Sequence, residues 1–305
     1  MKIVIVDGSR TAQRIFGDML AAAGHEPIPL YTGADALALL TSDDSIDVLM
    51  TSFELPDLSG LELCWEARLL SETRNPLYII AMSASRDESS VAKALDSGAD
   101  DFIGKPPART ELFARLRAAE RVIRAQNELI RLATVDLLTD LPNRRAFFAR
   151  AAYATRRADE EGTLVVAIAF DVDRFKVIND TFGHDAGDAV LRGIADVVRA
   201  TGLQAARIGG EEFAALIEGS TLAGVVARAE ELRSAVAAAR FSCGQQTVTA
   251  TISIGVAGHE HGRSVDAMMK RADIALYAAK RGGRDRVVVA AEHGAEVSAA
   301  GSDGS

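Results

Sequence analysis

The sequence of 305 residues is poor in cysteine, in clustered positive charge and in long apolar runs. Its two cysteines, Cys64 and Cys243, are too few and too far apart for a disulfide framework or a cysteine-rich metal site. The formal net charge is −9, and no basic stripe is present to contact a nucleic-acid backbone. No apolar run has the length of a membrane span, and residues 2–6 begin the chain as a strand instead of a signal peptide. These absences predict a cytoplasmic protein that binds neither nucleic acid nor a membrane.

The most informative segment that is present is Gly-Gly-Glu-Glu, residues 209–212, with apolar stretches on both sides. Such a run predicts two strands joined by a tight turn, because glycine tolerates the positive φ that a hairpin turn requires. Without a Cβ, the glycines also let backbone N–H groups approach a phosphate. Glu211 and Glu212 form a pair of carboxylates within reach of a hard cation. A Gly-Gly turn alone is common, so this interpretation depends on partners elsewhere in the chain.

Candidate partners follow a second apolar run upstream. Residues 164–170 predict a buried strand, and the strand ends in Asp171-Val172-Asp173. Carboxylates at the end of a buried strand are costly unless they bind a metal or accept hydrogen bonds. Residues 183–188, Gly-His-Asp-Ala-Gly-Asp, open a helix with an apolar face, and Lys280 and Arg284 end another helix. Acids for a cation and bases for a phosphate are therefore both available.

Five motifs now occur in a fixed order, and together they are specific. They are Asp136-x-Leu138-Thr139-x-Leu141-x-Asn143-Arg144-Arg145, the Asp171 and Gly183 motifs, the Gly-Gly-Glu-Glu-Phe hairpin, and the Lys280/Arg284 pair. The segment from about residue 134 to residue 290 resembles the GGDEF domain of diguanylate cyclases, in its GGEEF variant. The resemblance implies an α+β fold with a palm-like sheet related to nucleotidyl transferases and adenylyl cyclases. It also implies an enzyme that condenses two GTP into cyclic di-GMP and releases pyrophosphate.

The resemblance further implies a role for individual residues. A Mg²⁺ or Mn²⁺ ion would be held by Asp171, Glu211 and the Val172 carbonyl, with Glu212 beside them. The remaining implied roles are guanine recognition by Asn179 and Asp188, neutralisation of the triphosphate by Lys176, Lys280 and Arg284, and close approach of the phosphates to the Gly209 and Gly210 backbone. The catalytic group is then Glu211, Glu212 and Lys176.

Some of these residues also have ordinary structural explanations. Asp173 and Asp180 are best interpreted as a turn residue and a helix N-cap. Lys280 and Arg284 would by themselves be a solvated helix end, and only the family resemblance favours phosphate binding. Asp188 could simply be an acid favoured in a first helical turn, but its place in the motif favours contact with the base.

Two other functions are compatible with the same segment. One is a catalytically inactive GGDEF module that senses nucleotide or docks a protein, and the other is an enzyme that makes a mixed cyclic GMP-AMP. The intact hairpin and Asp171 favour an active enzyme, and Asp188 favours guanine because its carboxylate would face the N1 acceptor of adenine. Relatives often bind the cyclic product at an Arg-x-x-Asp before the hairpin. Residues 200–203 are Ala-Thr-Gly-Leu, so the sequence predicts no product-inhibition site.

The first 120 residues alternate strand-like runs with helical patterns, which predicts a doubly wound, flavodoxin-like α/β domain. Asp7, Ser83 and Lys105 make this part resemble a response-regulator receiver domain. A receiver normally has two acids after its first strand and a phospho-accepting Asp after its third. Here Gly8 replaces one acid and Ser52 stands at the acceptor position. Since a seryl hydroxyl cannot form the acyl phosphate and the lost acid weakens Mg²⁺ binding, we expect a pseudo-receiver. We expect its surface around Phe102 to dock a partner.

A heptad pattern joins the two parts. Its apolar or core positions are Leu112, Leu116, Ala119, Ile123, Gln126, Ile130 and Ala133. We expect one helix that leaves the receiver after about Arg117 and forms a parallel two-stranded coiled coil, with Gln126 fixing its register. A homodimer also suits the chemistry, because two half-sites with one GTP each must face one another. The predicted organisation is a pseudo-receiver at 1–117, a coiled-coil linker at 118–134, the GGDEF domain at 135–290 and a disordered tail at 291–305.

Overall fold

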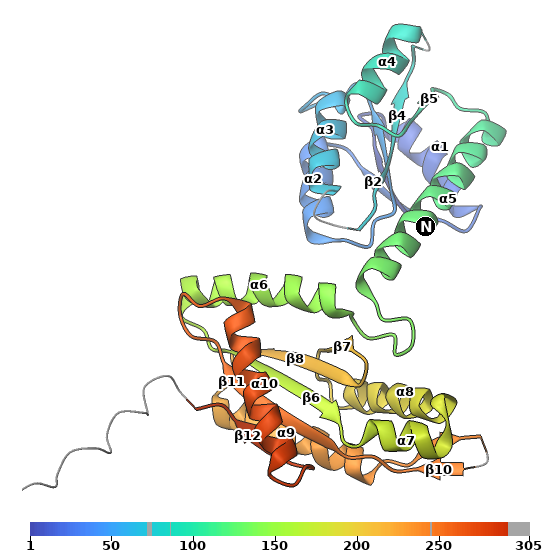
Figure 1. Cartoon of the computed structure of the whole chain (residues 1–305). Helices are drawn as coiled ribbons and strands as arrows, with labels where there is room; N and C mark the ends of the chain where they lie inside the picture. The colour runs from blue at the N-terminus through green and yellow to red at the C-terminus, as the bar shows by residue number, and fades with distance from the viewer. Residues whose placement is uncertain (72–74, 86, 245, 292–305) are drawn as a thin grey trace, which may run out of the picture. The chain divides into compact units, whose positions relative to one another are not determined.

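The computed structural model describes residues 1–71, 75–85, 87–244 and 246–291. The chain divides into two compact units, Met1–Ile130 and Arg131–Ser305, which Figure 1 colours from blue to green and from green to red. All but the first residue of the predicted tail lies outside the described part. Among the described residues, no helix combines the length and apolarity that a bilayer crossing requires.

The first unit is a parallel five-stranded sheet with the strand order β2-β1-β3-β4-β5. Its elements are β1 (Lys2–Val6), α1 (Arg10–Ala21), β2 (Glu26–Leu30), α2 (Gly33–Ser42), β3 (Val48–Ser52), α3 (Gly60–Ser71), β4 (Tyr78–Ser83), α4 (Glu88–Asp96), β5 (Asp101–Gly104) and α5 (Arg109–Thr134). The strands β1, β3 and β4 are apolar on both faces because helices cover both sides of the sheet. The predicted doubly wound α/β fold is confirmed.

The helix α5 packs against the core of the first unit over more residues than the heptad pattern predicts. Ala119 and Ile123 are buried with Leu112 and Leu116 in the same apolar cluster, against β1 and α1. The prediction that nothing is left to pack against beyond about Arg117 was therefore wrong. After Ile123 the apolar side chains become exposed, with Ile130 43% accessible. Only this last part of the seam is exposed to solvent.

The prediction that a docking surface surrounds Phe102 was also wrong, because Phe102 itself is buried. Phe102 is 7% exposed, and its ring packs edge-on against Phe53 at a centroid distance of 5.9 Å. Phe53 directly follows Ser52, so the aromatic pair belongs to the core below the acceptor position. The ring of Phe102 is apolar and is therefore stabilised by burial, and Phe53 supplies the packing partner.

The second unit is a mixed five-stranded sheet with the order β12-β11-β6-β8-β7. Its elements are α6 (Arg144–Glu161), β6 (Val165–Val172), α7 (Phe175–Phe182), α8 (His184–Ala200), β7 (Ala205–Gly209), β8 (Glu212–Glu218), α9 (Leu222–Ala238), the small hairpin β9 (Phe241–Cys243) and β10 (Gln246–Val248), β11 (Ile252–Gly258), α10 (Val265–Arg281) and β12 (Val287–Val289). The central strand β6 pairs antiparallel with β8 and β11. The α+β class predicted for this part is confirmed.

Helices cover both faces of this sheet, as Figure 1 shows. The apolar faces of α8 and α9 pack with one side of β6, β8 and β11, and those of α6 and α10 pack with the other side. Phe170 of β6 and Phe213 of β8 stack with a centroid distance of 5.2 Å in the first of these layers. Because β6 is buried on both faces, its position in the sheet is well defined. The residues at its end, which begin with Asp171, are therefore positioned by the core.

The turn of the hairpin differs from the predicted Gly-Gly turn. The strand β7 extends through Gly209, which pairs with Glu212, so the turn residues are Gly210 and Glu211. Only Gly210 has a positive φ, +47°. Glycine is therefore required for its backbone conformation at one position of the pair.

Candidate active site

A group of acids lies at the end of β6. Asp171 is 4% exposed and is the cross-strand neighbour of Glu212, the first residue of β8. Burial raises the pKa of Asp171 to about 6; the ammonium group of Lys280 lowers it, and the negative charges of Glu211 and Glu212 raise it further. Lys280 reaches Asp171 from α10, with its Nζ 2.8 Å from Oδ1. Lys280 thus pairs with Asp171 alone, while the charges of Glu211 and Glu212 also act on Asp171, so negative charge exceeds positive charge here.

The donor set fits a hard cation. Asp171 and Glu211 supply carboxylate oxygens, and Val172 is held beside them because its N–H donates to the Glu211 carbonyl at 3.3 Å. Within the described ranges, no three His, Cys, Asp or Glu side chains are grouped as a metal site. The proposed set needs only two side chains and one carbonyl, since Mg²⁺ completes its shell with water and substrate phosphates. The excess of acid over lysine is the observation that makes a cation fit.

Asn179 on α7 carries an unpaired buried acceptor. Its Oδ1 is one of four buried side-chain atoms without a hydrogen-bond partner among the described residues. A Cβ at Gly187 of α8 would come within 1.9 Å of this oxygen, so only glycine leaves room for the amide. A buried acceptor without a donor costs free energy, which a ligand that supplies an N–H group would recover. Gly187 was not predicted as a site residue, although it lies in the Gly-His-Asp-Ala-Gly-Asp motif.

The other predicted substrate contacts are more exposed. Asp188 lies in the second turn of α8, one residue after Gly187, and its carboxylate is 3.9 Å from Arg192. Lys176 is exposed on α7, and Arg284 is exposed on the turn after α10. The structure thus brings Asp171, Glu211, Glu212 and Lys280 together, and it places Asn179 next to the helix that carries Asp188. No described cavity contains all of them.

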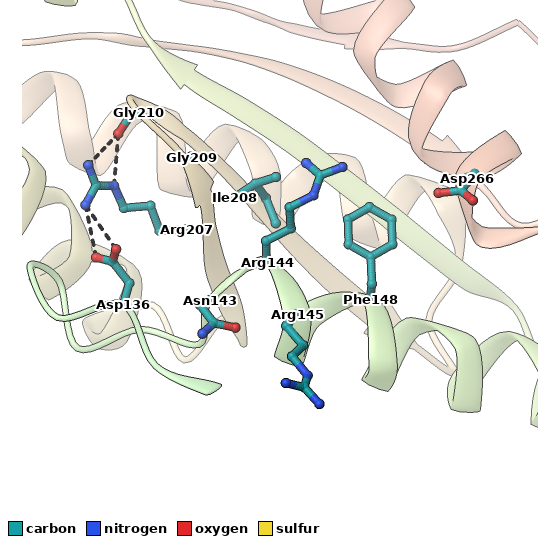
Figure 2. A pocket seen from close by; sticks show the side chains of 10 residues that line it. All are labelled: Asp136, Asn143, Arg144, Arg145, Phe148, Arg207, Ile208, Gly209, Gly210 and Asp266. Carbon is teal, nitrogen blue, oxygen red and sulfur yellow. Dashed lines mark hydrogen bonds and ion pairs between the residues drawn. The ribbon is translucent and has the colours of Figure 1, made fainter. Parts of the chain in front are cut away.

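Arg207 and Asp136 form an ion pair beside the hairpin, and the role of this pair was not predicted. Arg207 of β7 donates to both carboxylate oxygens of Asp136 at 3.1 Å and to the Gly210 carbonyl at 2.9 and 2.7 Å. Figure 2 shows this arginine between the carboxylate and the turn, at one side of a cavity of about 810 Å³. Burial alone would raise the pKa of Asp136, but hydrogen bonds from Thr139 and Arg207 outweigh it and lower the pKa. Asp136 and Arg207 therefore hold the turn at Gly210 in place.

The acceptor position of the first unit has a different balance of charge. Lys105 donates to Asp7, whose side chain is 4% exposed, and to the Ser52 hydroxyl at 2.7 Å. Gly8 adds no second acid, and Ser83 hydrogen-bonds locally to the N–H of Ser85 at 3.2 Å. One acid and one lysine thus form a closed pair around a buried serine.

The positions of the missing product site are occupied by structural contacts. Leu203 is 5% exposed and belongs to the apolar core. Arg199 donates to the Thr139 carbonyl at 2.9 Å and pairs with Asp196 at 2.7 Å. Neither residue offers the arginine and carboxylate of an Arg-x-x-Asp site.

Comparison with known proteins places each unit in a family. Residues 133–286 match the family described as diguanylate cyclase, GGDEF domain, and residues 3–117 match the response regulator receiver domain. The response regulator PleD of Caulobacter vibrioides is 33% identical over 300 residues, which cover 94% of this chain and 65% of PleD. The diguanylate cyclase DgcP of Pseudomonas aeruginosa is 42% identical over 161 residues, which cover 52% of this chain and 24% of DgcP. The chain therefore spans less than two thirds of the length of each of these relatives.

A solved structure is similar to the second part of the chain. The coiled coil and GGDEF domain of DgcB from Caulobacter crescentus, in complex with c-di-GMP, is similar with a TM-score of 0.55 and 38% identity. The match covers 59% of this chain and 99% of the DgcB chain.

Proposed function

The chain belongs to the GGDEF family of diguanylate cyclases, and on that premise we propose that it condenses two GTP into cyclic di-GMP and releases two pyrophosphates. The observation that carries this proposal is the acid group at the end of β6. Burial raises the pKa of Asp171 to about 6, and Glu211 and Glu212 lie close enough to raise it further. Such a site favours a divalent cation that arrives with a triphosphate.

The residues of the site would divide the work between metal, phosphates and base. Asp171, Glu211 and the Val172 carbonyl would hold Mg²⁺ or Mn²⁺, with Glu212 beside them. The ion, when bound, would stabilise the charge that develops on the phosphate oxygens. Lys280 would pair with a phosphate in the loaded site, because its ammonium group and a metal ion would compete for the oxygens of Asp171.

Phosphate and base contacts complete the proposed site. Lys176, Lys280 and Arg284 would neutralise the triphosphate, and the Gly209-Gly210 backbone would let it lie close to the hairpin. Asn179 and Asp188 would bind guanine, with Asp188 accepting from its N1–H and amino group. The buried, unpaired Oδ1 of Asn179 supports this role.

We propose that the active form is a homodimer, because each GGDEF domain would bring one GTP. The seam positions Gln126, Ile130 and Ala133 on the exposed end of α5 would pair with those of a second copy. The coiled coil of the similar DgcB structure supports this proposal. The first unit would add a dimer contact or a site for a signalling protein, and the protein would act in the cytoplasm.

The receiver would not be switched by aspartyl phosphorylation. Ser52 stands at the acceptor position, 3% exposed, and Lys105 is already paired with Asp7. After incubation with acetyl phosphate and Mg²⁺, mass spectrometry should show no added phosphoryl group on the protein. Covalent phosphate on the first unit would contradict this proposal. Product inhibition through residues 200–203 should likewise be absent, and an inhibitory cyclic di-GMP molecule bound there would refute that part.

The central experiment is a GTP assay with mass detection. The full chain is incubated with GTP and Mg²⁺, and the expected products are cyclic di-GMP and pyrophosphate. A Glu211→Ala variant should lose activity by about 100-fold or more, because it removes one of two side-chain oxygens that hold the cation. Arg14→Ala on the exposed face of α1 is the matched control. An inactive wild-type chain that still binds GTP would favour the nucleotide-sensing alternative.

A further inference from the structure

Asp173 is buried at the end of β6 and accepts hydrogen bonds from three other residues. It is 7% exposed. Its Oδ1 accepts from the Ser253 hydroxyl at 2.6 Å, and its Oδ2 accepts from the Thr251 hydroxyl at 2.7 Å. The same Oδ2 accepts from the backbone N–H of Asp285 at 3.1 Å. Asp173 lies in the turn after β6, as the sequence predicts. Its carboxylate also ties this turn to the start of β11 and to the turn after α10.

The turn that Asp173 holds has an unfavourable backbone. Gly283, Arg284 and Asp285 have φ values of +120°, +64° and +45°. For a non-glycine residue this region of φ is unfavourable, and such a conformation persists only where its surroundings hold it. Three contacts restrain the turn. The Asp285 N–H donates to the Asp173 carboxylate, and the Arg284 N–H donates to the Ala279 carbonyl at 3.0 Å. The guanidinium of Arg233 pairs with the Asp285 carboxylate at 2.7 Å.

The residue between these restraints is Arg284, whose side chain is uncommitted. Within the described part of the chain, its guanidinium has no hydrogen bond or ion pair. Arg284 and Asp173 line a common cavity of about 560 Å³ with Arg174. A long cationic side chain loses rotamer freedom when it binds an anion, and a fixed backbone reduces the remaining cost.

We propose that Asp173 is a positioning residue that fixes the backbone of Arg284 for contact with the substrate triphosphate. This inference rests on the proposed function, since it assigns Arg284 a phosphate to bind. Asp173 itself does not touch the substrate, because both of its oxygens are occupied by protein donors. The side chain of Asp171, two residues earlier, instead pairs with the ammonium group of Lys280. The two acids therefore divide the work, one at the cation and one behind the arginine.

The first test compares substrate affinity in Asp173→Asn and in a matched control. The amide keeps the shape of the carboxylate but presents N–H groups to donors, so the turn loses its restraint. We expect the KM for GTP to rise about tenfold while kcat changes less than threefold, and the inhibition constant of pyrophosphate to rise with KM. The inhibition constant of guanosine should not move, because Asn179 and Asp188 are untouched. The control is Asp159→Asn, which removes an acid that holds the turn at Gly262 and pairs with His259 in the same unit. It should leave KM unchanged.

The second test asks whether Asp173 acts through Arg284. In Arg284→Ala the KM should rise, and adding Asp173→Asn should raise it little further, because the positioned side chain is already gone. Independent, multiplied effects would overturn the inference. The rate of trypsin cleavage after Arg284, measured by mass spectrometry, should be higher in Asp173→Asn than in the wild type. An unchanged rate would also overturn the inference. If Asp173→Asn does not fold, Thr251→Val removes one donor from the same oxygen and should give the same changes at smaller size.

Failure of this inference differs from failure of the proposed function. A wild-type chain that binds neither GTP nor guanosine would overturn the proposed function, and with it the phosphate role of Arg284. A wild-type chain that converts GTP, with an unshifted KM in Asp173→Asn, would overturn only the positioning role.

Discussion

The two units each bury an aspartate at the end of a strand and bring a lysine to it, but the balance of charge differs. In the first unit, Asp7 and Lys105 form a closed pair around Ser52. In the second unit, Lys280 faces Asp171 while Glu211 and Glu212 add two further acids. A lysine that neutralises one acid completes a structure, whereas a lysine beside three acids leaves room for a cation. The same pair of residue types is therefore structural in one unit and, by our proposal, catalytic in the other.

The sharpest way to test this comparison is to remove each lysine. Lys105→Met leaves Asp7 buried without its partner and should destabilise the first unit by about 3–5 kcal/mol. Lys280→Met should destabilise the second unit by less, because Asp171 lies among residues that we propose bind a cation. This variant should mainly lower cyclase activity. Denaturant unfolding followed by circular dichroism, together with the GTP assay, measures both effects. Lys93→Met on the exposed face of α4 is the control, and equal losses of stability in both variants would break the comparison.

The next largest effect concerns the base site, which has no counterpart in the first unit. Gly187→Ala places a Cβ within 1.9 Å of the Asn179 Oδ1 and should displace the amide. We expect kcat/KM for GTP to fall about 100-fold, as when a site loses a hydrogen bond that its substrate needs. Gly17→Ala, a helical glycine of the first unit with open space around its Cα, is the matched control. A Gly187→Ala enzyme of full activity would remove Asn179 from the site.

The two units should also respond to acid at different pH. Burial lowers the pKa of His25 below 6.5, with the N-terminal charge adding to it and Glu120 opposing it. Neutral His25 thus stabilises the first unit above about pH 6.5, and this contribution is lost as the pH falls through the lowered pKa. The pKa of Asp136 is lowered as well, so its ion pair with Arg207 stabilises the second unit above about pH 4 and is lost below it.

Two variants separate these contributions. His25→Gln should make the first unit less sensitive to acid between pH 7 and pH 5. Asp136→Asn should destabilise the second unit by about 2 kcal/mol at pH 7 and by less at pH 3. Urea unfolding at each pH is the measurement, and a pH-independent difference for Asp136→Asn would show that the pKa of Asp136 is the same in the folded and unfolded states.

The smallest effect is chemical and needs no variant. Burial raises the pKa of Cys64 to about 12, whereas Cys243 lies partly exposed on β9. Cys243 should react with a thiol reagent in the native protein, and Cys64 should react only on unfolding of the first unit. Labelling of Cys64 at the rate of Cys243 would show that the receiver core opens readily.

The fold and both families could be predicted because they depend on local patterns. Continuous apolar strands alternating with amphipathic helices predict the doubly wound unit, and its parallel sheet confirms them. The order of the five motifs identifies the GGDEF family, which the family comparison confirms. The role of each site residue stays a prediction.

Other features could not be predicted, because they depend on which segments meet. A heptad pattern continues smoothly through Ile123, and only the packing of β1 and α1 shows where α5 leaves the core. The burial of Phe102 depends on its partner Phe53, which is far away in the sequence. Asp173 lies in a turn as predicted, but its donors, Thr251 and Asp285, come from segments far along the chain, so the sequence does not show that it holds them.

The sequence by itself thus determined the two folds, their order along the chain, and the residue types available for chemistry at the hairpin and after β6. These follow from side-chain periodicity and from motifs within one or two elements. The tertiary structure alone decided how charge is balanced around each buried aspartate, which glycine makes room for Asn179, and that Asp173 holds the turn of Arg284. Charge balance and steric room are sums over neighbours in space, and those neighbours are assembled only when the sheet forms.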